Sequence, residues 1–341
     1  MLALIETANS VASAKDTIGA FSAVCLSAKS NSLSATATDG IYWMTAETEC
    51  DGDLEPVNIH AATLLDTIKK VSGDELDIRL NKGKVEIKAG KSKRTLVPMD
   101  VDVTPRPPQD AFGAPVEIGL KAINDFCRSA VSQDEIRPHL SGINLEAENG
   151  QCIARASDGI SGARLVVGDC SETFNALIPP RLFDIVLREV DAASVEFGAR
   201  RVRVSWEGRT INAPLIEAVF PDLDRVIYEH PHCMEVDSAE FMAAMVAVST
   251  LAEKTMKGPK VRLELGPECV MGAKNPSGEA TEPFQANWDG EPMEIRFASH
   301  RAIAACKAMG GVIGVYMNGP KDVMVFSKGD GAAKYIIMPM E

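Results

Sequence analysis

The chain has 341 residues, of which 45% are hydrophobic and 24% are charged, which is an ordinary composition for a globular protein. A chain of this length is too long for one hydrophobic core. Its formal net charge of −13 argues against a surface that is basic all over, although a basic stripe on an acidic body is compatible with it. No apolar run approaches the ~18 residues of a membrane span. The first residues, Met1–Glu6, lack the basic region of a signal peptide, so we expect a cytoplasmic protein that does not associate with a membrane.

The eight cysteines are scattered and none forms a Cys-x-x-Cys pair. Without an export signal, they are expected to be reduced thiols. Residues 230–233, His-Pro-His-Cys, resemble a metal cluster, but ligands adjacent around a proline have poor geometry. The sequence contains no phosphate-binding loop, zinc-protease motif or hydrolase elbow. It therefore predicts no metal, no cofactor and no catalytic residue.

In chain order, the first third alternates strands and two helices before a stiff proline-rich linker. Strands are predicted over 1–8, 33–38, 41–45, 57–59, 76–80, 84–88 and 94–99, and helices over 11–24 and 61–71. The turn signal Asp39-Gly40 separates the second strand from the third. Residues 104–108, Thr-Pro-Arg-Pro-Pro, are predicted to be an extended linker.

The same order recurs twice beyond this linker. Thr38-Asp39-Gly40-Ile41 and Ser157-Asp158-Gly159-Ile160 are 119 residues apart, as are the strand ends Ile59, Ile178 and Phe297. Helices are predicted over 121–131, 181–190 and 299–309, each beside several short strands. Because two landmarks share this spacing, we predict three similar α+β domains with two helices and antiparallel sheets each, over 1–112, 113–227 and 228–341.

The predicted helices carry much of the positive charge of an acidic chain. Their basic residues are Lys15, Lys69, Lys70, Lys121, Arg128, Arg181, Arg188, Lys254, Lys257, Arg301 and Lys307. Helical charge is usually a solvated face. The other interpretation is that all six helices face one polyanion, whose phosphates they contact independently of base sequence. Charge alone supports the two interpretations equally.

The chain ends on an apolar run, Tyr335-Ile336-Ile337-Met338-Pro339-Met340, before Glu341. By itself this run predicts a last core strand that stops at Pro339, with adaptable methionines beyond it. Together with the three-fold repeat and the basic helices, it resembles the bacterial DNA polymerase III beta subunit, the sliding clamp. Two further stretches carry the resemblance: residues 220–227, Phe-Pro-Asp-Leu-Asp-Arg-Val-Ile, and Leu140-Ser141-Gly142 through Ala156-Ser157-Asp158-Gly159.

The resemblance implies a non-catalytic processivity factor with the DNA-clamp fold. Two chains would close head to tail into a ring around double-stranded DNA, with the basic helices facing the duplex, and would tether the replicative polymerase. Ring closure would involve Arg94 and Leu96 of one chain and Thr250 and Leu251 of the other. Family members tend to be apolar at the position of Arg94.

The resemblance also implies a pocket for a short linear motif of the polymerase, the clamp loader and repair proteins. The residues that match it are Leu140, Ser157, Gly159, Ile160, Pro221, Arg225, Val226, Ile336, Ile337, Met338, Pro339 and Met340. The family usually has His-Arg-Leu where this chain has Ile160-Ser161-Gly162, and a basic and then an apolar residue where it has Glu341. These departures predict an altered motif preference and suggest a divergent clamp of phage or plasmid type. The alternatives are a repeat-domain enzyme with an unrecognised site and a ring-forming scaffold that does not bind DNA.

Overall fold

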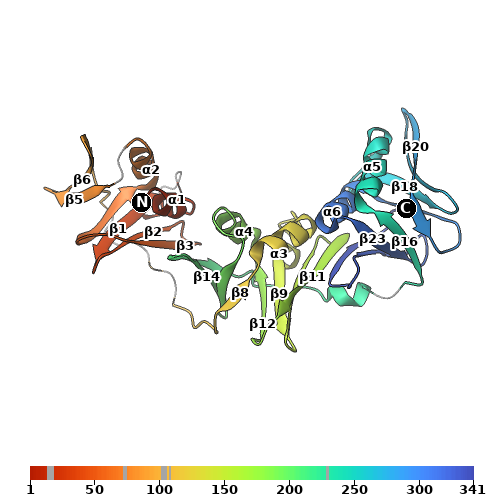
Figure 1. Cartoon of the computed structure of the whole chain (residues 1–341), viewed down its shortest axis with the longest axis horizontal. Helices are drawn as coiled ribbons and strands as arrows, with labels where there is room; N and C mark the ends of the chain where they lie inside the picture. Colours follow the sequence, from red (N-terminus) through yellow and green to blue (C-terminus); the bar gives the residue numbers. More distant parts are fainter. Residues whose placement is uncertain (14–18, 72–74, 101–105, 107–108, 228–229) are drawn as a thin grey trace. The chain divides into compact units, whose positions relative to one another are not determined.

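The structure is a computed structural model of the chain and describes residues 1–13, 19–71, 75–100, 106, 109–227 and 230–341. Figure 1 follows the chain from its N-terminus to its C-terminus. Contacts within the chain define two compact units. Unit 1 comprises Met1–Ile118 and Asp184–Leu215, and unit 2 comprises Gly119–Phe183 and Ile216–Glu341. The division into three domains by sequence repeat stays a prediction.

Unit 1 is built on an eight-stranded antiparallel sheet and a small three-stranded sheet. The large sheet has the order β4 (Leu54–His60), β1 (Ala23–Lys29), β2 (Ser32–Thr38), β3 (Trp43–Glu49), β15 (Arg209–Pro214), β14 (Arg201–Trp206), β13 (Ala193–Phe197) and β8 (Val116–Ile118). The small sheet has the order β5 (Asp77–Asn81), β6 (Lys84–Ala89) and β7 (Ser92–Leu96). The helices of unit 1 include α1 (Leu2–Asn9) and α2 (Ala61–Lys69), which pack on each other. Alternate residues of the strands face a core that includes Leu26, Ile59 and Leu64.

Unit 2 contains a nine-stranded and a five-stranded sheet. The first has the order β12 (Phe174–Ile178), β9 (Ile143–Glu148), β10 (Gln151–Ser157), β11 (Ser161–Asp169), β25 (Ala333–Ile337), β24 (Met324–Ser327), β23 (Val312–Met317), β16 (His232–Asp237) and β21 (Ala286–Trp288). The second has the order β17 (Glu253–Thr255), β18 (Gly258–Leu265), β19 (Cys269–Asn275) and β20 (Gly278–Phe284), and its fifth strand, β22 (Met293–Ala298), also pairs with β18. All these pairings are antiparallel.

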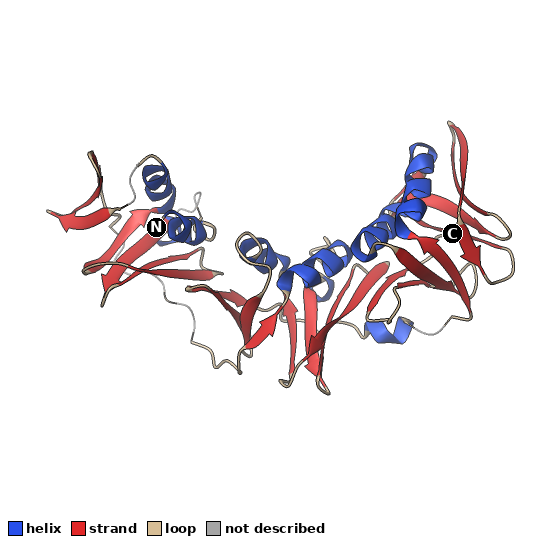
Figure 2. Ribbon diagram, in the orientation of Figure 1, coloured by secondary structure: helices blue, strands red, loops and turns tan. Residues whose placement is uncertain are grey.

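The helices of unit 2 are α3 (Leu120–Cys127), α5 (Ser238–Val248) and α6 (Ser299–Met309), and α4 (Pro180–Val186) spans the boundary between the units. Figure 2 shows α3, α6 and α5 following one another along one side of the unit 2 strands. Short 3-10 segments are η1 (Gly19–Ser22), η2 (Arg128–Ala130), η3 (Pro138–Leu140), η4 (Leu223–Val226) and η5 (Ser249–Leu251). The six α-helices among the described residues and the antiparallel sheets confirm the predicted α+β class.

The N-terminal prediction was wrong. Residues 2–9 form α1 where a strand was predicted over 1–8. Leu4, Ile5 and Ala8 recur at helical spacing and are buried, and alanine and leucine favour a helix. The helix predicted over 11–24 is replaced from residue 19 by η1 and by β1, which pairs with both β2 and β4. Residues 14–18, including Lys15, and all of the predicted linker except Arg106 lie outside the described residues.

Candidate functional site

The turn between β10 and β11 is organised by Asp158. Its Oδ1 accepts hydrogen bonds from the backbone N–H groups of Ile160 at 2.9 Å and Ser161 at 2.7 Å, and from the Ser161 hydroxyl at 3.2 Å. Ser157 Oγ accepts from the Gly159 N–H and donates to the Ser161 carbonyl. Gly159 has φ of +84°, which glycine adopts without the Cβ strain of other residues. A short acidic side chain and a glycine thus fix this turn.

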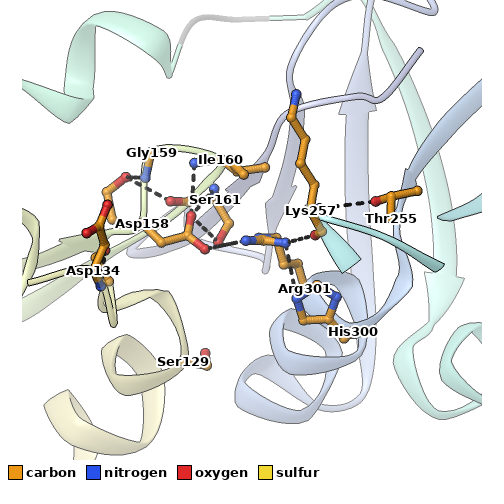
Figure 3. Close-up of polar contacts among 12 residues, drawn as sticks. Ser129, Asp134, Asp158, Gly159, Ile160, Ser161, Thr255, Lys257, His300 and Arg301 are labelled. Carbon is orange, nitrogen blue, oxygen red and sulfur yellow. Dashed lines mark hydrogen bonds and ion pairs between the residues drawn. The ribbon is translucent and has the colours of Figure 1, made fainter. Parts of the chain in front are cut away.

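The same carboxylate forms an ion pair with α6. Arg301 donates from Nη2 to Asp158 Oδ2 at 2.6 Å and from Nε at 3.1 Å, and the two side chains are only 12% and 17% exposed. Arg301 Nη1 donates to the Lys257 carbonyl in the turn between β17 and β18. Figure 3 shows the guanidinium reaching from α6 to Asp158. One arginine therefore connects the β10–β11 turn, α6 and the β17–β18 turn.

The electrostatics of Asp158 follow from these contacts. Burial alone would raise the pKa of its carboxyl, because the charged form loses water. The hydrogen bonds from Ser161 and Ile160 and the charge of Arg301 act in the opposite direction and outweigh burial, so that the pKa lies below its ordinary value. Asp158 is therefore held as a carboxylate at neutral pH, and its charge is matched by Arg301.

The C-terminal tail, residues 338–341, runs from this turn to the edge of the five-stranded sheet. The strand before it, β25, pairs with β11 and with β24. The Met338 N–H donates to the Ile160 carbonyl at 2.8 Å, and the Met340 N–H donates to the Arg296 carbonyl at 2.6 Å. Pro339 lies between them and has no N–H to donate. Lys260 Nζ donates to the Glu341 carbonyl at 3.3 Å.

Two grooves flank the tail. One has a volume of about 340 Å³ and is lined by the tail together with Glu294, Arg296, Pro320 and Lys321. The other has a volume of about 600 Å³ and is lined by Pro339–Glu341, the turn residues Thr255–Lys257 and Lys260. Met338 is 42% exposed and Met256 is fully exposed. Thioether side chains beside a groove adapt to different apolar partners, so this region is suited to bind an extended peptide.

The segment η4 is held on the nine-stranded sheet by an ion-pair network. Asp224 accepts hydrogen bonds from Arg155 Nη2 at 2.7 Å and Arg164 Nε at 2.8 Å, and Arg155 also donates to Glu146 at 2.6 Å. Burial alone would raise the pKa of Asp224, but the two arginines outweigh it and lower the pKa. This network fixes η4 on β10 and β11 of the nine-stranded sheet.

The residues predicted for the pocket all belong to unit 2, where they lie on or beside η3, the β10–β11 turn, η4, β25 and the tail. Leu140 is buried in η3 and lies against the turn, since a Cβ on Gly159 would be 3.7 Å from its Cδ1. Pro221, Arg225 and Val226 are exposed on or beside η4. Ile336 and Ile337 are buried in β25, and Ile160 is half-buried. The sequence analysis missed Asp158 and Arg296, although Asp158 stands inside the repeated motif.

The predicted DNA-contacting residues occupy different kinds of structure. Lys69, Lys121, Arg181 and Lys307 are exposed and helical, and Lys70 follows α2 directly. Arg128 lies in η2, and Arg188 lies beyond α4. The helical prediction was wrong for Lys254 and Lys257, which lie in β17 and the following turn. Arg301 is helical, but its buried ion pair does not fit the predicted phosphate contact.

Of the residues predicted for ring closure, Arg94 and Leu96 lie on β7 and Thr250 and Leu251 lie in η5. The strand β7 is an edge of the three-stranded sheet. Leu251 lies against β20, an edge of the five-stranded sheet, because a Cβ on Gly278 would be 3.6 Å from its Cδ1.

Within the described residues, no group of His, Cys, Asp or Glu side chains has the geometry of a metal site. No described helix has the length and apolarity needed to cross a membrane.

The chain is similar to known proteins that are all described as DNA polymerase III beta subunits or beta sliding clamps. A family model described as "DNA polymerase III beta subunit, N-terminal domain" matches residues 1–107. The beta sliding clamp of Caulobacter vibrioides is 23% identical, with 100% of this chain and 97% of that protein covered. The beta sliding clamp of Staphylococcus aureus is 25% identical over 292 residues, which are 81% of this chain and 77% of that protein.

Solved structures agree in fold. A structure of the DNA polymerase III beta subunit from Pseudomonas aeruginosa superimposes with a TM-score of 0.90 at 22% identity, covering 100% of this chain and 97% of that one. The beta subunit of the DNA polymerase of Streptococcus pyogenes gives the same TM-score at 19% identity, with the same coverage. The fold is therefore that of these subunits over the whole chain.

Proposed function

Because the chain is related along its whole length to the bacterial beta sliding clamps, we propose that it is a sliding clamp itself. It would encircle duplex DNA without catalysing a reaction and would tether the replicative polymerase in the cytoplasm. The full-length likeness in fold to DNA polymerase III beta subunits carries this proposal, since a clamp acts through its shape. Tethering raises the effective concentration of the polymerase at the primer end without a tight contact to DNA.

The ring would be a head-to-tail homodimer. The edge strands β7 and β20 offer unpaired backbone groups that antiparallel pairing between two chains would satisfy. Arg94 and Leu96 of β7 would meet the region of Thr250 and Leu251, which adjoins β20. Such pairing protects two edges that would otherwise promote aggregation. The three repeats of each chain, over 1–112, 113–227 and 228–341, would then contribute six similar domains.

Partners would bind at the tail. An extended segment of the polymerase, the clamp loader or a repair protein would place apolar side chains between η4, the β10–β11 turn and residues 338–340. The exposed Met338, Val226 and Pro221 would contact it, and the ion pair of Asp158 with Arg301 would hold the turn in place. Two methionines suit several related motifs.

The deciding experiment measures retention on DNA. The chain is placed on nicked circular DNA by a clamp loader, and the complex is isolated by gel filtration before and after one restriction cut. We expect retention on the circle and rapid loss after the cut, because a closed ring leaves only through an end. Retention that ignores the cut would contradict encirclement. A ring of two chains that is never retained would instead support the scaffold without DNA binding.

The DNA-contacting lysines give a second prediction. Lys121→Ala and Lys307→Ala, both on exposed helical positions of unit 2, are expected to weaken binding to a short linear duplex. The slope of log affinity against log salt should become less steep by about 0.9 for each phosphate that the variant no longer neutralises. Fluorescence anisotropy at several salt concentrations measures this slope. Lys274→Ala, an exposed lysine of β19, is the control and should leave it unchanged.

A further inference from the structure

A buried leucine of η4 covers Gly162, the glycine that follows the β10–β11 turn of the candidate partner site. Gly162 on β11 pairs with Ile336 on β25. A Cβ on Gly162 would lie 2.9 Å from Leu223 Cδ1 and 3.0 Å from Ile336 Cγ1, closer than side chains normally approach. Leu223 is only 6% exposed and packs with Val323, Val325 and Ile336. The space above Gly162 is therefore occupied by leucine methyl groups.

Leu223 is held in this position by its segment. The Asp222 carboxylate accepts a hydrogen bond from the Asp224 N–H at 3.2 Å at the start of η4. The Asp224 carboxylate is bound by Arg155 and Arg164, which project from β10 and β11. The bond between Asp222 and Asp224 shapes the segment, and the contacts of Arg155 and Arg164 with Asp224 hold it on the sheet beside Leu223. By contrast, Val226 at the end of the same segment is 39% exposed.

We propose that Leu223 determines the specificity of the partner site, by taking the space on Gly162 that a bulky apolar anchor of a partner would occupy. The site then accepts a motif with a small apolar anchor and rejects one with an aromatic anchor. This inference rests on the proposed function, since it concerns the peptide site of that function. The other apolar side chains of the partner would bind in the grooves beside Met338 and Met340. An anchor that cannot be buried loses the stabilisation of its apolar area.

The test uses the full chain and three fluorescein-labelled peptides that differ only in one anchor residue, alanine, leucine or phenylalanine. For the wild type, we expect the phenylalanine peptide to bind no more tightly than the alanine peptide. Leu223→Ala removes the side chain above Gly162 and should bind the phenylalanine peptide about ten-fold more tightly than the wild type does. Unchanged or weaker binding by a folded Leu223→Ala variant would overturn the inference.

Val226→Ala is the matched control, because it shortens an exposed apolar residue of the same segment. It should weaken all three peptides alike and by only a few-fold. Leu223→Val provides a milder change if Leu223→Ala does not fold, as judged by its melting curve. The valine variant should gain affinity for the leucine peptide, and the absence of any gain would count against the inference.

Retention on circular DNA separates this inference from the proposed function. A chain that stays on circles but shows no anchor-dependent gain in any Leu223 variant keeps its proposed function and loses the inference. If the Leu223→Ala variant binds the phenylalanine peptide more tightly but the wild type is not retained on circular DNA, the inference is kept and the proposed function is lost. In that case the site is a peptide site of a protein that is not a DNA clamp.

Discussion

Deleting Met338–Glu341 is expected to reduce partner-peptide binding by more than about 100-fold while leaving DNA retention nearly unchanged. The deleted residues line both grooves beside the tail, so their loss removes a wall from each. The preceding Tyr335, Ile336 and Ile337 are buried in β25 and remain. The deletion costs two backbone hydrogen bonds, from Met338 to Ile160 and from Met340 to Arg296, on a partly exposed surface. That loss is small compared with the core of unit 2.

Peptide anisotropy and retention on circular DNA, measured on the same protein, check both halves of this expectation. Deletion of Glu341 alone is the control, because it spares Met338, Pro339 and Met340. It should change peptide affinity by only a few-fold, since the contact from Lys260 to the Glu341 carbonyl is exposed. If the long deletion abolishes both activities equally, the tail is a structural part of unit 2 and not a binding wall.

The end of the chain shows how far sequence reasoning extends. Tyr335-Ile336-Ile337 predicted a strand, and β25 is that strand, because β-branched and aromatic residues fit a buried sheet. The start shows the opposite outcome. Leu2-Ala3-Leu4-Ile5 is short and apolar, and such a run fits a buried strand or one face of a helix equally well. Packing of α1 on α2 and on the sheet decided between them.

The candidate site was predicted as a set of residues but not as a set of contacts. The repeat placed Asp39 and Asp158 in equivalent turns, and both carboxylates do accept backbone hydrogen bonds two and three residues ahead. The partner of Asp158 in α6 is 143 residues away, and no local pattern marks it. For the same reason, charge counting assigned Arg301 to a DNA surface, whereas folding buries it beside a carboxylate. Such long-range pairs depend on the tertiary arrangement of the elements, which local sequence patterns do not reveal.

Replacing Asp158 by alanine is expected to lower the free energy of unfolding of unit 2 by about 3–5 kcal/mol. The substitution leaves the guanidinium of Arg301 poorly solvated and without its carboxylate, since that side chain is only 12% exposed. It also removes three hydrogen bonds that fix the β10–β11 turn. Urea unfolding of the variant and the wild type measures the difference. Asp158→Asn is the matched variant, because its side-chain oxygen still accepts from the turn while the ion pair is removed.

A double-mutant cycle that combines Asp158→Ala with Arg301→Ala separates the coupling energy of the ion pair from the contribution of the turn. Removing both partners should cost about 2 kcal/mol less than the sum of the two single changes, because no buried charge is then left alone. Additive costs would show that Arg301 contributes through its hydrogen bond to the Lys257 carbonyl and its packing on α6. In that outcome, the connection between the β10–β11 turn and α6 would not depend on Asp158.

Acidification supplies an independent check of the same pair. The pKa of Asp158 is lower in the folded chain than its unfolded value of about 3.9. The folded state therefore binds fewer protons here, and the stabilisation from the ionised carboxylate is fully present above the unfolded pKa. It disappears as the pH falls through the lower, folded pKa. The Asp158→Asn variant lacks this contribution at every pH, so the difference in unfolding free energy between wild type and variant should narrow as the pH falls from about 5 through the folded pKa. A gap that stays constant over this range would mean that the charge of Asp158 does not stabilise unit 2, and that the turn acts through its hydrogen bonds alone.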